Sequence, residues 1–116
     1  MVSKINRFHG RRSINNVYKY GSSVNLSQIN LRFLSVPKDP NIKIAVVVSK
    51  KICKSAVQRN RIRRRVYEII RKNLDSIKPS SRLIFNVYSD TYIKIEQEKL
   101  SETITKLLQK ADLSSK

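Results

Sequence analysis

The sequence predicts one α+β domain, an α/β two-layer sandwich whose elements follow the order α-β-β-α-β-α. Two long segments repeat apolar residues at helical spacing, and three shorter ones are rich in the β-branched and aromatic residues typical of strands. The chain has 116 residues, 40% of them apolar, which suffices for one modest core. We therefore assign 1–116 to a single domain.

The chain begins with a basic segment and a short helix. Residues 1–12 carry several cations and show no period, which predicts a basic, loosely held arm. Ser13 is placed to cap a helix of about two turns, because Ile14 and 17–18 fall on one helical face. Gly21 is expected to end this helix in the left-handed conformation.

The next two elements are predicted strands. Residues 29–36 alternate between apolar and polar side chains, as a half-buried strand requires. The turn formers of 37–41 should reverse the chain, and 42–48 is apolar on both faces, which indicates a central strand. We expect these two strands to form a hairpin.

The longest predicted helix covers 55–74, where no glycine or proline interrupts the pattern. Its buried stripe is predicted to consist of Ile62, Val66, Ile69 and Ile70. Pro79 ends this region, and 83–88 follows as a third strand. A second amphipathic helix closes the chain, with an apolar face made of Leu100, Ile104, Leu107, Leu108 and Ala111.

Positive charge is the outlying property of this sequence. Its 25 Lys and Arg residues face 8 acidic ones, and the resulting net charge of +17 favours a polyanionic partner such as nucleic acid. The charge is uneven, because 1–67 holds 16 cations and one acid, whereas 68–116 holds nine cations and seven acids. The basic surface is therefore expected to come from the first part of the chain.

Several other classes of function are disfavoured. No apolar run approaches the ~20 residues that span a bilayer, and no signal-type stretch follows Met1, so we expect a soluble, cytoplasmic protein that binds no membrane. His9 is the only histidine and Cys53 the only cysteine, so one chain can form neither a disulfide nor a Cys/His zinc site. We interpret Cys53 as a small semi-buried thiol rather than a redox centre.

The densest cationic segment is 59–65, which contains five arginines and no acid. At 100° per residue, the positions largely opposite the apolar stripe are those of Arg61, Arg64, Arg65 and Lys72. Arginine suits RNA because its planar guanidinium binds phosphate bidentately and can stack on bases. A solvated helix face is the structural alternative, but like charges at this spacing repel one another, so a contact with RNA is the preferred interpretation.

Residues 46–51 read VVVSKK, 54–64 read KSAVQRNRIRR, and Glu68 follows. These strings, with their Arg-Asn-Arg motif, resemble the signature of the bacterial ribonuclease P protein subunit family. The resemblance continues toward both ends of the chain, through Arg7, Phe8, Ile14, Val17, Tyr18, Gly21, the strand 83–87 and the final helix. It therefore spans nearly the whole chain in family order.

The resemblance implies the protein cofactor of a ribozyme that removes the 5′ leader from precursor tRNA, with the catalytic magnesium ions held by the RNA subunit. It implies no catalytic residue and no metal ligand in this chain, and the single histidine and the lack of a paired-acid motif point the same way. It also implies a left-handed crossover through the basic helix, where general rules favour a right-handed one. The free protein is expected to be monomeric.

Carried over position by position, the resemblance assigns residues to two contacts. Those expected to bind the RNA subunit are Lys50, Lys51, Lys54, Arg59, Asn60, Arg61, Arg63, Arg64 and Arg65. Those expected to bind the precursor tRNA leader, in a cleft between the first helix and the sheet, are Ile14, Tyr18, Arg32 and Ser49.

Three positions depart from the family's pattern. Ile14 stands where the family usually has phenylalanine, Arg32 where some members have an aromatic residue, and Tyr67 where a basic residue is common. Single-stranded RNA is recognised by stacking on aromatic side chains beside cations, so we expect Arg32 to stack or to bind phosphate instead. For Tyr18, a half-buried core position and a leader contact are both open.

Two other classes of protein share this size and charge. A small ribosomal or other structural RNA-binding protein would have the same composition and no catalytic groups, and only the order of the motifs separates it from the preferred interpretation. A DNA-binding regulator would require paired short helices or a dimer surface, whereas predicted strands flank the basic helix here.

Overall fold

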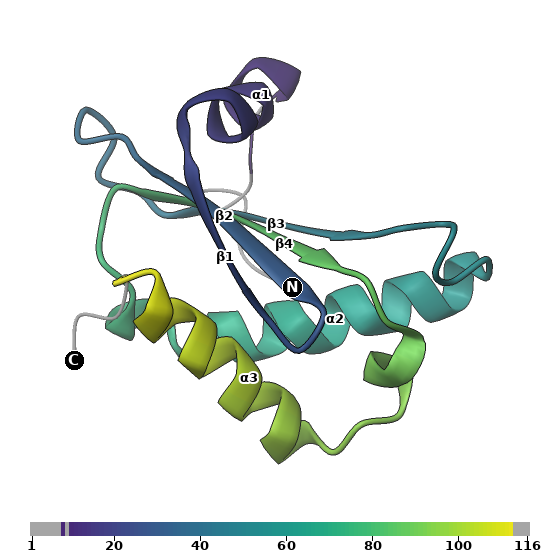
Figure 1. Cartoon of the computed structure of the whole chain (residues 1–116). Coiled ribbons are helices and arrows are strands. Elements are labelled where there is room, and N and C mark those ends of the chain that lie inside the picture. The colour runs from purple at the N-terminus through teal and green to yellow at the C-terminus, as the bar shows by residue number, and fades with distance from the viewer. Residues whose placement is uncertain (1–7, 9, 113–116) are drawn as a thin grey trace.

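The structure, a computed structural model, describes residues 8 and 10–112 (Figure 1). Its helices are α1 (Gly10–Tyr20), α2 (Ala56–Lys72) and α3 (Gln97–Lys110), with two short 3₁₀ turns, η2 (Leu74–Ser76) and η3 (Asp90–Ile93). Its strands are β1 (Ser22–Leu26), β2 (Ile29–Ser35), β3 (Lys43–Val48) and β4 (Ser81–Val87). The predicted α+β class is confirmed, and the order of elements gains one strand, β1.

In the described part of the chain, the sheet has the strand order β1-β2-β4-β3. β2 pairs antiparallel with β1 and β4, and β3 pairs parallel with β4. The predicted hairpin of 29–36 with 42–48 is therefore wrong, because β4 lies between these two strands. β3 is an edge strand and not a central one: β4 is buried along most of its length, whereas Val47 of β3 is 45% exposed.

β1 is absent from the sequence prediction because its residues, SSVNL, lack the apolar alternation that marks a strand. It joins β2 through Ser27 and Gln28, whose φ angles of 50° and 65° form a two-residue turn. Turns of this kind usually contain glycine or asparagine, so no local signal indicates the hairpin. Pairing with β2, whose first three residues are buried, stabilises it instead.

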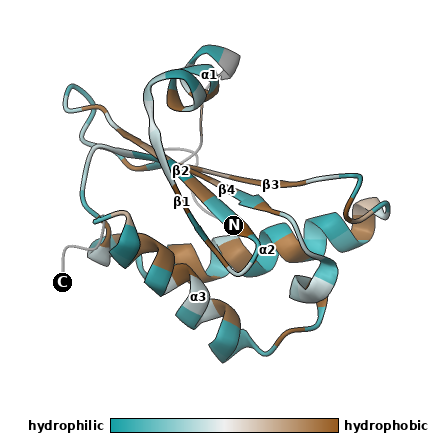
Figure 2. Ribbon diagram, in the orientation of Figure 1, coloured by the Kyte–Doolittle hydropathy of each residue, from teal (hydrophilic) through white to brown (hydrophobic). Residues whose placement is uncertain are grey.

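α2 and α3 cover one face of the sheet and enclose the main core with it, so that apolar sides of helices and strands face one another (Figures 1 and 2). The predicted stripes are confirmed, since all nine of their residues are buried: Ile62, Val66, Ile69, Ile70, Leu100, Ile104, Leu107, Leu108 and Ala111. α2 also connects β3 to β4, which are parallel neighbours, so the predicted crossover through the basic helix is present. Its left hand stays a prediction.

α1 lies on the other face of the sheet, where its Val17 is fully buried (Figure 1). The helix begins at Gly10, so 10–12 belong to it and not to an arm, and Ser13 lies inside the helix instead of capping it. The rest of the predicted arm, 1–7 and residue 9, lies outside the described residues.

Gly21 ends α1, but without the predicted left-handed conformation. Its backbone N–H donates to the carbonyl oxygen of Val17 at 2.9 Å. A Cβ at this position would lie 2.4 Å from that oxygen and 2.5 Å from the carbonyl oxygen of Phe33. Glycine is required here because the backbones of α1 and β2 approach too closely for any side chain.

Candidate nucleic-acid interface

The orientation of α2 follows from its cap and its apolar side. The hydroxyl of Ser55 accepts a hydrogen bond from the backbone N–H of Gln58 at 3.3 Å, which satisfies one of the free donors of the first turn. Ile62 and Val66 are fully buried in the core. This anchoring turns the opposite side of the helix toward solvent.

Arg61 and Arg64 are the exposed members of the arginine run. Within the described residues, neither side chain has a hydrogen bond or an ion pair. They line a shallow pocket of about 500 Å³ with Val57, Gln58 and Arg65, and Val57 is 78% exposed. Free guanidinium groups beside an exposed apolar side chain suit a partner that offers both phosphates and base or sugar surface.

Arg65 points inward, so the prediction that it faces outward is wrong. Its guanidinium donates to the carbonyl oxygens of Tyr92 at 2.8 Å, of Ile93 at 3.1 Å and of Ile95. It also donates to the side-chain oxygen of Gln97 at 3.2 Å. Burial lowers its pKa below the ordinary value, and the charge of Arg61 lowers it further. Arg65 joins α2 to the segment before α3, and this geometry disfavours its predicted contact with RNA.

Arg59 and Arg63 have partners close by in the chain. Arg59 donates to the carbonyl oxygens of Cys53 and Lys54, both at 2.9 Å, and so holds the preceding loop against the first turn of α2. Arg63 donates to the side-chain oxygen of Asn60. Asn60 thus has a local hydrogen-bonding role within the helix, and its predicted contact with the RNA subunit stays a prediction.

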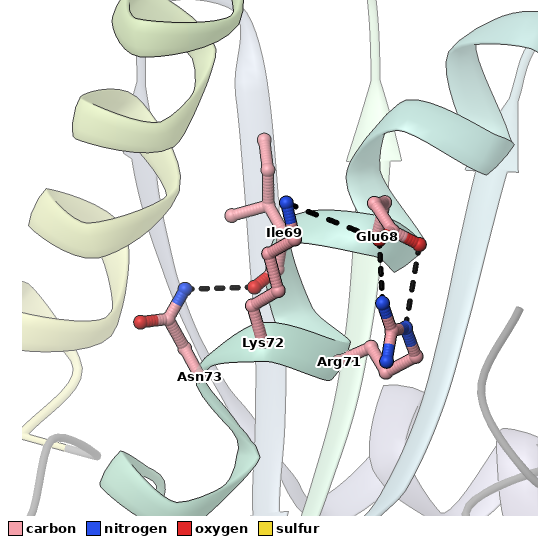
Figure 3. Close-up of polar contacts among 5 residues, drawn as sticks. All are labelled: Glu68, Ile69, Arg71, Lys72 and Asn73. Carbon is pink, nitrogen blue, oxygen red and sulfur yellow. Dashed lines mark hydrogen bonds and ion pairs between the residues drawn. The ribbon is translucent and has the colours of Figure 1, made fainter.

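The second half of α2 is partly neutralised (Figure 3). Glu68 accepts a hydrogen bond from Arg71 at 2.6 Å, and Nζ of Lys72 lies 4.0 Å from the same carboxylate. The hydrogen bond from Arg71 is the main reason that the pKa of Glu68 is lowered. At the end of the helix, Asn73 donates to the carbonyl oxygen of Ile69 at 2.7 Å. The cations of α2 that lack a counter-charge therefore all lie at 59–65.

The loop at 49–54 adds cations at the start of α2. Lys50, Lys51 and Lys54 are exposed. Ser49 organises the turn, because its hydroxyl accepts the backbone N–H of Lys51 at 3.1 Å and its carbonyl oxygen accepts two further N–H groups of the loop. The loop and the first half of α2 together form a cationic face.

Cys53 lies at the end of this loop and is only 4% exposed. Its Sγ lies 3.5 Å from the side-chain oxygen of Gln58 and 3.8 Å from the carbonyl oxygen of Ser55, so the single thiol hydrogen has two weak acceptors to share. It is more deeply buried than the sequence predicted, and its surroundings are those of a structural thiol.

A second polar cluster lies between α1 and the sheet. The hydroxyl of Tyr18 donates to Oδ1 of Asn86 at 3.1 Å, and the guanidinium carbon of Arg32 lies 5.0 Å from the centre of the Tyr18 ring. Tyr18 is 40% exposed. The predicted stacking of Arg32 thus has a partner inside the protein. Tyr18 combines the two alternatives left open for it, since its hydroxyl is bound to the sheet while part of the residue remains accessible.

Within the described part of the chain, the other two residues predicted to bind the leader, Ile14 and Ser49, have no contact with this cluster that resembles the one between Tyr18 and Arg32. Ile14 is half-buried and one turn before Tyr18 on α1. Ser49 follows β3, whose exposed residue Val47 pairs in register with Asn86. The structure brings Tyr18 and Arg32 into contact and leaves Ser49 in the loop beyond the strand.

Tyr67, which departs from the family's pattern, has a structural partner. Its hydroxyl accepts a hydrogen bond from the backbone N–H of Val46 at 3.2 Å. An edge strand leaves such N–H groups without a partner in the sheet, and Tyr67 satisfies this one. The residue therefore ties α2 to β3, a role that only the tertiary structure reveals.

Residue 8 and residues 10–112 contain no metal-binding cluster and no membrane-spanning helix. No three His, Cys, Asp or Glu side chains in this range gather in a way that could hold a metal ion. None of its helices is both long and apolar enough to cross a membrane.

The fold and the cationic face define a class of small α+β protein in which a basic helix crosses between two parallel strands of a mixed sheet. The sequence matches the Ribonuclease P family over residues 2–112. The chain belongs to this family.

Curated relatives agree with this assignment. A ribonuclease P protein component from a Synechococcus strain is 32% identical to this chain over 97% of the chain and 86% of its own length. One from Bacillus velezensis is 31% identical over 72% of the chain and 71% of its own length.

Solved structures share the fold. The RNase P protein of Staphylococcus aureus aligns with a TM-score of 0.81 at 20% identity and covers 93% of this chain and 96% of its own. The RNase P protein of Thermotoga maritima aligns with a TM-score of 0.78 at 22% identity and covers 90% of this chain and 96% of its own. At these identities the likeness concerns the fold alone.

Proposed function

We propose that this chain is the protein subunit of ribonuclease P: it binds the catalytic RNA subunit and the 5′ leader of precursor tRNA, and it assists endonucleolytic removal of that leader. The observation that carries the proposal is the pair of exposed arginines, Arg61 and Arg64, on a helix whose other side is anchored in the core. The family and the names of the curated relatives support it.

The RNA subunit is proposed to bind the cationic face. The contact is expected to centre on Arg61 and Arg64, with Lys50, Lys51 and Lys54 beside them. Each cation that neutralises a phosphate releases counterions, which makes such binding strong at low salt. Arg59, Asn60 and Arg63 lie within the same run, and their local hydrogen bonds help to shape this surface.

The leader is proposed to bind beside α1. Tyr18 offers a partly exposed ring, and Arg32 places a cation over that ring. An aromatic platform beside a cation is the usual means of binding single-stranded RNA without reading its sequence. Ile14 and Ser49 remain proposed neighbours of this site.

The chemistry is proposed to belong to the RNA subunit, whose magnesium ions would activate water and stabilise the charge that develops on the phosphate. The protein's own residues hold the RNA and the leader in place and neutralise phosphate charge. Positioning of this kind can contribute several kcal/mol to a reaction without any catalytic side chain. The free protein is proposed to be a cytoplasmic monomer.

Reconstitution with the cognate RNA subunit and a precursor tRNA tests the proposal. We expect the protein to lower the magnesium concentration needed for cleavage and to tighten binding of precursor over mature tRNA.

The double variant Arg61→Ala/Arg64→Ala should weaken assembly with the RNA subunit while its circular dichroism spectrum stays that of the wild type. Binding to the RNA without either effect on cleavage or precursor binding would instead indicate a structural RNA-binding protein.

A further inference from the structure

Three asparagines form a row across the sheet on the side of α1. Asn25 of β1 pairs in register with Asn30 of β2, and Asn30 pairs with Asn86 of β4. Nδ2 of Asn30 donates to Oδ1 of Asn25 at 2.8 Å, and Nδ2 of Asn86 donates to Oδ1 of Asn30 at 3.4 Å. We call Asn25, Asn30 and Asn86 the asparagine row.

The asparagine row ends on Tyr18. Oδ1 of Asn86 accepts the hydroxyl of Tyr18 at 3.1 Å, so the hydrogen bonds run in one direction from α1 through β4 and β2 to β1. Each amide thereby donates to the next one, and a further bond joins Nδ2 of Asn30 to the carbonyl oxygen of Val24 at 3.5 Å. Removal of the Tyr18 hydroxyl would take away the first donor of the series.

The asparagine row does not favour the stability of the sheet. Asn86 is 6% exposed and Asn30 is 8% exposed, asparagine is depleted in strands, and a buried amide is costly unless it is hydrogen-bonded. The same side of the sheet also buries Val17 and Ile84 completely. Ile84 on the same strand shows that this side of the sheet accepts apolar side chains, so the role of Asn86 lies in the groups that it binds.

Asn86 restrains the ring of Tyr18 through the hydroxyl of that residue. The hydroxyl is bound to Asn86 on β4 and the ring lies under Arg32 on β2, so two strands restrain one side chain. A restrained ring has less conformational freedom to lose when a base stacks on it. Restraint of this kind strengthens binding without adding a contact.

We propose that Asn86, supported by Asn30, is a positioning residue for recognition of the leader: it fixes the hydroxyl of Tyr18, so that the ring is preorganised as a stacking surface for a single-stranded nucleotide. The inference rests on the proposed function, because the leader is the ligand. It adds a residue that makes no contact with RNA through its own side chain.

The experiment measures the preference of the reconstituted holoenzyme for precursor over mature tRNA, as a ratio of dissociation constants, in a double-mutant cycle of Tyr18→Phe and Asn86→Leu. Each single variant should lower the preference by about threefold to tenfold. The double variant should lose no more than the stronger single one, because both substitutions remove the same hydrogen bond. Tyr20→Phe, which removes a hydroxyl from the exposed neighbour on α1, is the matched control and should leave the ratio unchanged.

Each other outcome has a definite meaning. If Tyr18→Ala abolishes the preference while Tyr18→Phe and Asn86→Leu keep it, the ring binds the leader but the positioning role is wrong. Equal losses for precursor and mature tRNA would assign Asn86 a structural role and overturn the inference. If Asn86→Leu does not fold, Tyr18→Phe alone decides. A wild-type protein without any preference would overturn the proposed leader site itself.

Discussion

At the scale of single residues, the five arginines of 59–65 have three kinds of surroundings. Two are exposed without partners among the described residues, two bond to their own neighbourhood in the chain, and Arg65 holds three carbonyl oxygens of another segment. Arg61 and Arg64 lie furthest from the buried stripe. The prediction that placed Arg65 opposite the stripe with them was too broad, because at 100° per residue Arg65, like Arg63, lies nearer the border of the stripe. A side chain at the border of the buried stripe can reach a neighbouring segment of the fold. A side chain on the opposite side of the helix cannot.

Arg65 and Arg64 form a matched pair for testing this division. Arg65→Ala is expected to lower the free energy of unfolding by about 2 kcal/mol, because carbonyl oxygens of 92–95 lose a charged donor. Arg64→Ala should change it by less than about 0.5 kcal/mol, as is usual for an exposed side chain without partners. Urea unfolding followed by circular dichroism measures both. Equal stability of the two variants would show that the inward contacts of Arg65 do not stabilise the fold.

At the scale of elements, α2 is attached to the sheet through apolar and polar contacts. Its buried stripe packs in the core, and the hydroxyl of Tyr67 reaches the backbone of β3 at Val46. β3 needs this attachment because it has a strand neighbour on one side only. Tyr67 and the buried stripe therefore hold α2, which bears the cationic face, against β3.

Tyr67→Phe tests the attachment of β3. The substitution keeps the ring and removes only the acceptor of the Val46 N–H, so the free energy of unfolding should fall by about 1 kcal/mol. Hydrogen exchange of the Val46 amide should also become faster than in the wild type. Tyr20→Phe, at a residue that is 65% exposed, is the control and should change neither quantity. An unchanged exchange rate in Tyr67→Phe would contradict the assigned role.

At the scale of the whole molecule, few acids oppose many cations, and Asp39 and Glu68 are acids that form ion pairs with arginine. Asp39 lies in the turn between β2 and β3 and pairs with Arg82 of β4 at 2.9 Å. Its pKa lies below the ordinary 3.8, first because the backbone N–H of Asn41 donates to it and then because Arg82 does. The pKa of Glu68 lies below the ordinary 4.5 through its bond with Arg71.

These two lowered pKa values predict a loss of stability in acid. A carboxylate whose pKa is lower in the folded state stabilises the fold fully above its unfolded pKa, and this contribution disappears as the pH falls through the folded value. The melting temperature should therefore fall between about pH 5 and about pH 2. In the double variant Asp39→Asn/Glu68→Gln that decline should be shallower than in the wild type. If the melting temperature of the double variant falls with pH as steeply as that of the wild type, groups other than Asp39 and Glu68 cause the loss of stability in acid.

The sequence by itself determined the parts of this protein that depend on neighbours along the chain. Both long helices, their buried stripes and the exposed positions of Arg61 and Arg64 follow from a period of 3.6 residues, which is local. The Arg-Asn-Arg motif and its surroundings likewise indicated the family that the comparisons then showed. Local periodicity and local motifs require no knowledge of which strand pairs with which.

Only the tertiary structure decided the rest. Strand order depends on competition for the most buried place, and β4 takes that place between β2 and β3. The inward turn of Arg65 depends on a segment about 30 residues away, and the asparagine row depends on the register of three strands. Pairings between distant segments are set by total burial and hydrogen bonding, which no local pattern encodes. The exposed arginines could therefore be predicted from the sequence, but the residues that hold Tyr18 in place could not.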